Sequence, residues 1–114
     1  MKAAHFICKR EGSGLRNLSL IDKHEMIYRS GNWDLSLAEA RTLIGGMIFL
    51  HPTKSELSAF GGEVLGVAEV LDNSLARAKR VIFRVRATLK GRGVKWRGQA
   101  HAMTSYGGII EIEP

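Results

Sequence analysis

The polar residues between two apolar stretches of the sequence are the ones best suited to chemistry. The connection "HPTKSELS", residues 51–58, is rich in hydroxyl groups and is longer than a simple hairpin turn requires. Hydroxyls, backbone amides and one ammonium group can together bind a phosphate. The P-loop pattern GxxxxGK[ST] is absent. We therefore expect a ligand-binding rim, formed by His51, Thr53, Lys54, Ser55 and Ser58.

A second set of residues is basic. The chain has 17 Lys and Arg against 11 Asp and Glu, a net charge of +6. Nine basic residues and no acidic one lie between residues 77 and 97. Such segregated charge attracts a polyanion such as DNA or RNA, although a solvated basic hairpin that only aids solubility has the same composition. The expected contacts to nucleic-acid phosphates are Arg80, Arg84, Arg86, Lys90, Arg92, Lys95 and Arg97.

Each of the two tryptophans has two interpretations. Trp33 lies in "SGNWD", beside Asn32, and is either a platform for a stacked base or the plug of a small core. Trp96 lies between Lys95 and Arg97, which suits either insertion against nucleic acid or an ordinary core position with solvated neighbours. The residue types alone leave both choices open.

The elements that must position these residues are mostly strands. "RVIFRVRA" alternates apolar and basic residues, which predicts a strand over 80–87 with one buried face. "AAHFIC", "VLGVAEVL" and "IIEIE" predict further strands, the second of them central. The capping box "SLAE" at 36–39 predicts a helix of about two turns. We therefore expect residues 1–114 to form one domain, a mainly β (α+β) small antiparallel or mixed barrel with one or two short helices.

The lone Cys8 and the absence of a long apolar run favour a cytoplasmic protein. The histidines and the cysteine do not have metal-ligand spacing, so we expect no metal and no cofactor.

"NWDLSLAEARTLIGGMIFLH" followed by "GGEVLGVAEVL" resembles the EVE domain of the PUA-like superfamily, which also includes YTH and ASCH domains. The shared residues are Trp33-Asp34, Ala40-Arg41, residues 46–51 and residues 66–70. The resemblance covers roughly residues 30–72 and implies a five- or six-stranded barrel that holds a single, often methylated, base in an aromatic pocket. We accordingly expect a base near Trp33, rimmed by Asn32 and the 51–58 connection.

Two other function classes stay open. Some ASCH relatives hydrolyse modified nucleosides or RNA, and Lys54, Ser55 or Thr53, and Glu63 could supply a comparable catalytic set. The basic segment could instead meet an acidic protein partner. The binding interpretation is the preferred one of the three.

Overall fold

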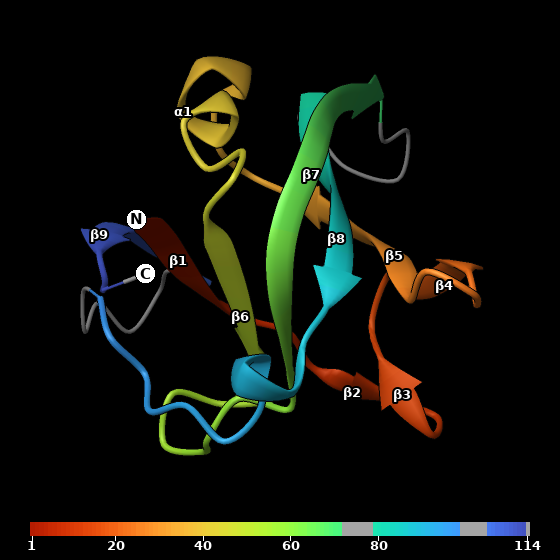
Figure 1. Ribbon diagram of the computed structural model, residues 1–114, viewed down its shortest axis with the longest axis vertical. Helices are drawn as coiled ribbons and strands as arrows, with labels where there is room; N and C mark the ends of the chain where they lie inside the picture. The colour runs from red at the N-terminus through yellow and green to blue at the C-terminus, as the bar shows by residue number, and fades with distance from the viewer. Residues whose placement is uncertain (72–78, 99–104, 114) are drawn as a thin grey trace.

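The computed structural model describes residues 1–71, 79–98 and 105–113, and its main element is a mixed sheet of seven strands (Figure 1). Its strand order is β4-β5-β8-β7-β6-β1-β9. Strands β1 and β6 are parallel, and the other pairs in this sheet are antiparallel. The sheet consists of β1 (Lys2–Ile7), β4 (Leu18–Asp22), β5 (Ile27–Trp33), β6 (Met47–His51), β7 (Phe60–Leu71), β8 (Lys79–Ala87) and β9 (Tyr106–Glu111). A small hairpin pairs β2 (Arg10–Glu11) with β3 (Gly14–Leu15).

The core lies on the inner face of this curled sheet. Phe6 of β1 contacts Trp33 of β5, with ring centroids 4.5 Å apart, although three strands separate β1 from β5 in the sheet. Within the described residues, the edge strands β4 and β9 do not pair with each other. The prediction of a mainly β fold is confirmed, with β7 central, whereas the described strands form an open sheet and not a closed barrel.

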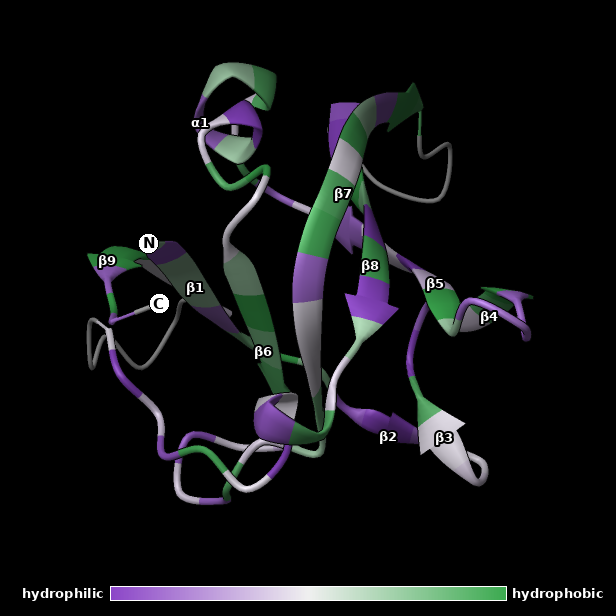
Figure 2. Ribbon diagram, viewed as in Figure 1, coloured by the Kyte–Doolittle hydropathy of each residue, from purple (hydrophilic) through white to green (hydrophobic). Residues whose placement is uncertain are grey.

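Strand β8 has the predicted alternation. Val81, Phe83 and Val85 are buried, and Arg84 and Arg86 are exposed on the opposite face. Bands of alternating hydropathy are visible along β7 and β8 in Figure 2. The basic residues after β8 do not form a hairpin with it in the described part, because the chain forms a 3₁₀ turn, η1 (Leu89–Gly91), and then continues to residue 98 without strand pairing. We call residues 92–98 the crossing segment.

The predicted helix begins where the capping box places it but is shorter. Helix α1 spans Leu37–Arg41, and the Ser36 hydroxyl accepts a hydrogen bond from the Glu39 amide at 3.0 Å. The Glu39 carboxylate accepts from the Tyr106 hydroxyl of β9 and so fastens the helix to that strand. Ile44 follows the end of the helix and is 49% exposed.

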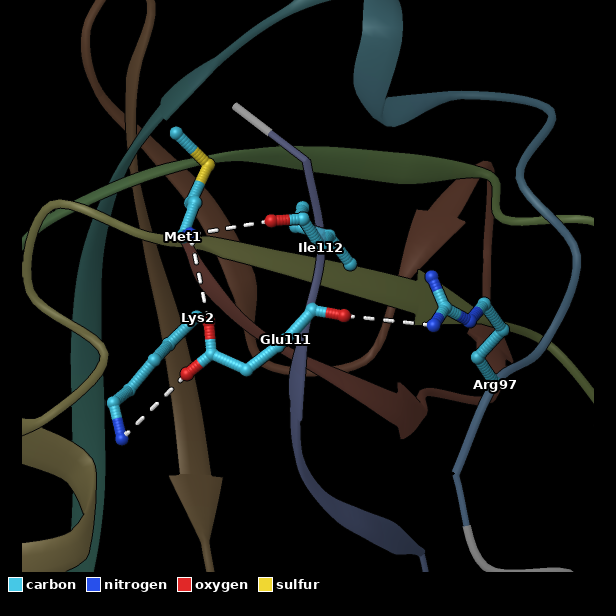
Figure 3. Close-up of polar contacts among 5 residues, drawn as sticks. All are labelled: Met1, Lys2, Arg97, Glu111 and Ile112. Atoms are coloured by element: carbon cyan, nitrogen blue, oxygen red, sulfur yellow. Dashed lines mark hydrogen bonds and ion pairs between the residues drawn. The ribbon is translucent and has the colours of Figure 1, made fainter.

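The two ends of the described chain are held together beside β1 and β9 (Figure 3). The amino group of Met1 donates to the Ile112 carbonyl at 3.1 Å and forms an ion pair with Glu111. Lys2 and the Arg97 side chain also contact Glu111, the latter at its carbonyl. Glu111 therefore lies away from the arginines of β8, since β9 pairs with β1, at the far end of the sheet.

A close backbone contact sets the path of the chain after β8. A Cβ atom added to Gly61 would lie 2.6 Å from the carbonyl oxygen of Gly91, and one added to Gly91 would lie 2.3 Å from Gly61 backbone atoms. Both glycines are buried. The start of β7 and η1 can therefore touch only because neither residue has a side chain.

We predict that Gly61→Ala lowers the free energy of unfolding by about 1–3 kcal/mol, because a backbone group must move to admit the new methyl. The matched control is Gly14→Ala, where a Cβ has no neighbour within 4 Å; it should change stability by less than about 0.5 kcal/mol. Urea denaturation measures both. Equal stability of the two variants would contradict the close contact.

Candidate functional site

A cavity of about 670 Å³ lies where the two ends of the curled sheet approach each other. Its walls come from three separate stretches: residues 7–9 at the end of β1, residues 16–17 before β4, and residues 31–33 at the end of β5. Glu11 and Ser105 complete the lining. The volume lies in the range of small-ligand sites, about 300–1,000 Å³.

Trp33 has the core position that was one of its two interpretations. The residue is only 8% exposed, its ring packs on Phe6, and its indole N–H donates to the Ser30 hydroxyl at 3.0 Å. It is also one of the residues that line the cavity.

Asn32 lines the same cavity and is held by a residue that the sequence interpretation missed. The Arg29 guanidinium donates to the Asn32 side-chain oxygen at 3.2 Å. Arg29 lies on β5 directly opposite Arg84 of β8. The cavity thus borders the arginine-bearing outer face of the sheet.

The other charged residues at the cavity were also missed, because they lie in polar turns without periodicity. Lys9 and Arg16 add positive charge, and Arg16 forms an exposed ion pair with Glu11 at 3.9 Å. Cys8 donates its S–H to the Arg16 carbonyl at 3.2 Å. Burial raises the pKa of the Cys8 thiol to about 11, so this residue is a protonated wall residue and not a thiolate nucleophile at neutral pH.

The 51–58 connection does not line the cavity. Ser58 is buried and structural: its hydroxyl donates to the Gly91 carbonyl at 2.7 Å and accepts from the Val94 amide at 3.0 Å. These bonds fasten the connection to the chain after η1, and the two segments run side by side in Figure 1. Ser58 is therefore explained by the fold without a ligand.

The two other hydroxyls of this connection have partners within the connection itself. Thr53 donates to the Glu56 side chain at 3.1 Å, and its oxygen lies 3.1 Å from that of Ser55. Glu56 also forms an ion pair with Arg10 at 3.3 Å. A carboxylate already occupies the position that a phosphate was expected to take.

His51 belongs to a buried histidine pair on the opposite face of β1 and β6. Its Nδ1 lies 2.9 Å from the Glu56 carbonyl and therefore donates, which leaves its Nε2 to accept from Nδ1 of His5 at 2.7 Å. Both imidazoles are fully buried. Trp96 packs edge-on against both rings, at centroid distances of 5.2 and 5.8 Å, and the Lys54 ammonium lies 5.6 Å from the Trp96 ring centroid.

This packing decides the interpretation of Trp96. The crossing segment covers the outer face of β1 and β6, and Trp96 is the residue that fills the interface while Lys95 and Arg97 stay exposed. A Cβ on Gly107 of β9 would lie 2.8 Å from the Trp96 ring, so a glycine is needed beneath it. Trp96 is a packing residue of a second small core, remote in sequence from the cavity residues.

The predicted phosphate-binding residues fall into three groups. Arg80 has a side chain only 12% exposed and pairs with Asp34 at 3.9 Å. Arg86 pairs with Glu25 and Glu63. Arg84 is exposed, and in the described part of the chain it forms no ion pair. The remaining cations are exposed on η1 and the crossing segment: Lys90, Arg92, Lys95 and Arg97.

The residues of the hydrolase alternative are not brought together. Glu63 lies opposite Met47, at the start of β6, whereas Lys54 and Ser55 follow His51, at its end. Five strand residues separate these ends by about 13 Å. Among the described residues, no group of three or more His, Cys, Asp and Glu is arranged to hold a metal ion. Nor does the described part contain a helix long and apolar enough to cross a membrane.

Comparison with known proteins gives no match: no family model, curated protein or solved structure matches the chain.

The histidine pair predicts loss of stability in acid. Burial, then the neighbouring His51 and Arg97, lowers the pKa of His5 from 6.5 to about 4, and burial also lowers the pKa of His51. As the pH falls, the imidazoles are protonated in the unfolded chain at a higher pH than in the fold. The free energy of unfolding is therefore highest above pH 6.5 and decreases as the pH falls toward 4. The His5 share is about 2–3 kcal/mol.

We expect His5→Phe, which keeps an aromatic ring against Phe49, to flatten the dependence of the free energy of unfolding on pH between 6.5 and 4. The exposed His24 gives the control, because His24→Gln should leave the curve as steep as in the wild type. Urea denaturation at half-unit pH intervals measures all three proteins. Parallel curves for the wild type and His5→Phe would refute the assignment.

Proposed function

We propose that this chain is a nucleic-acid-binding module, an open relative of the PUA-like barrels acting in the cytosol, in which one nucleotide base occupies the cavity beside Trp33 and Asn32. The observation that carries the proposal is the cavity itself, which is lined by an aromatic residue and an amide, Trp33 and Asn32, together with the cations Lys9 and Arg16. Aromatic rings bind bases by stacking, worth about 1–3 kcal/mol per base, and cations bind the phosphates.

The charge distribution supports a polyanionic ligand. Lys9 and Arg16 line the cavity itself. Exposed cations of the crossing segment and of β8 extend the positive surface over the outer face of the sheet. A net charge of +6 concentrated in this way favours rapid, salt-sensitive association with DNA or RNA.

The site residues of this proposal differ from those expected from the sequence. Asn32 and Trp33 remain ligand residues, and Arg84 remains the phosphate contact of β8. His51, Ser58 and Trp96 are assigned to packing instead, because each has its partners in the fold. The geometry does not support the hydrolase alternative, since its residues lie apart.

The base-binding claim is testable by fluorescence because the chain has two tryptophans. In Trp96→Phe, Trp33 is the single remaining tryptophan. We expect short single-stranded DNA or RNA, with plain and methylated bases, to quench Trp33 emission saturably, in the concentration range where fluorescence anisotropy reports binding. Binding by anisotropy without any change in Trp33 emission would place the ligand on the basic surface alone.

The role of Asn32 is tested by Asn32→Ala, which should weaken oligonucleotide binding about fivefold, the value of one ordinary hydrogen bond. Ser19→Ala on the exposed face of β4 is the matched control and should bind as the wild type does. If an acidic peptide competes as well as the oligonucleotide and Asn32→Ala has no effect, the partner is an acidic protein and the proposal fails.

A further inference from the structure

We propose that Arg29 and Arg84 form a phosphate-binding site beside the cavity, so that the preferred ligand is a nucleotide recognised through its phosphate as well as its base. The inference rests on the proposed function, and it adds a site made of two guanidinium groups on neighbouring strands. The chemical class that such a site takes is a phosphate monoester or diester, which an arginine fork binds through two parallel hydrogen bonds.

The sheet register places the two arginines together. Arg29 of β5 and Arg84 of β8 are direct cross-strand partners and share the outer face of the sheet. Like charges in this position destabilise a sheet unless an anion lies between or over them. On its other side Arg84 faces Gly66 of β7, and its guanidinium lies 4.0 Å from the place where a Cβ would be. Because Gly66 has no side chain, the Arg84 guanidinium can lie over it on the outer face of the sheet.

The neighbouring arginines show what is unusual about this pair. Arg80 and Arg86, on the same strand as Arg84, are each compensated by carboxylates, from Asp34 in the first case and from Glu25 and Glu63 in the second. Within the described residues no carboxylate forms an ion pair with Arg29 or Arg84. Arg84 therefore lies between two compensated arginines on β8, whereas neither Arg84 nor its partner Arg29 is compensated. This is the arrangement expected where a ligand supplies the negative charge.

The pair is also continuous with the cavity. Arg29 donates to the Asn32 side chain, and a Cβ on Gly31 would lie 3.4 Å from the Arg29 guanidinium. Gly31 and Asn32 both line the cavity. A base held beside Trp33 therefore has its phosphate within reach of Arg29, with Arg84 as the second arm of the site.

The test compares nucleosides, nucleoside 5′-monophosphates and inorganic phosphate, with binding measured by calorimetry at low salt. We expect the wild type to bind the monophosphates at least tenfold more tightly than the nucleosides. Arg84→Gln and Arg29→Gln should each reduce this advantage to about twofold or less. Lys23→Gln, at an exposed cation outside the proposed binding surface, is the matched control and should keep the full advantage.

A second readout separates this site from general charge loss. Without ligand, Arg84→Gln should melt at the same temperature as the wild type or higher, because it removes the repulsion from Arg29. Phosphate should raise the melting temperature of the wild type and not of Arg84→Gln. If Arg84→Gln and Lys23→Gln lose affinity equally, or if phosphate stabilises wild type and Arg84→Gln alike, the site is refuted.

The two proposals can fail independently. Phosphate binding that depends on Arg84 in a protein whose Trp33 emission never changes would keep the arginine site and reject the base in the cavity. Trp33 quenching by nucleosides and nucleotides alike, unaffected by Arg84→Gln, would reject the arginine site and keep the cavity.

Discussion

The contact between Phe6 and Trp33 joins the two ends of the sheet, and the candidate site depends on it. These residues belong to strands separated by three others, yet their ring centroids lie 4.5 Å apart across the interior. The sheet must therefore curl, which brings the chain that leaves β1 beside the chain that leaves β5. Residues 7–9 and 31–33, at the ends of these two strands, form much of the cavity wall. The core contact and the cavity wall are thus parts of the same arrangement.

The outer face of the sheet is divided between packing and exposure. Over β1 and β6, the crossing segment and the 51–58 connection form a cover, in which Trp96 packs on the His5–His51 pair and Ser58 binds the backbone near Gly91. Over β5 and β8 the described chain provides no such cover, and arginines occupy the surface. The basic residues that form one block in the sequence therefore lie on two different parts of the molecule.

The features that depend on neighbouring residues could be predicted from the sequence. The alternation along β8 and the Ser36 cap are local patterns, and the structure has both. The His5–His51 hydrogen bond joins residues 46 positions apart, and no periodicity reports such a pair. Ser58 was expected to bind a ligand because hydroxyls in a long connection suit a phosphate. A hydroxyl suits a backbone carbonyl equally well, and only the close approach of Gly61 and Gly91 decides between them.

The cavity could be predicted only in part. Asn32 and Trp33 stand out by residue type, whereas Lys9, Arg16 and Arg29 lie outside the dense basic block and reach the site through the fold. Counting charges along a segment finds a basic strand but does not show which cations have carboxylate partners. That distinction depends on cross-strand register, since Glu63 compensates Arg86 from β7.

The most direct test of the account is a map of backbone amide chemical shifts during titration of the isotope-labelled protein with a short single-stranded oligonucleotide. We predict that the largest changes fall on residues 7–9, 16–17 and 29–33, followed by the residues around Arg84. Changes confined to η1 and the crossing segment, with the cavity residues unmoved, would contradict it and leave only a basic surface.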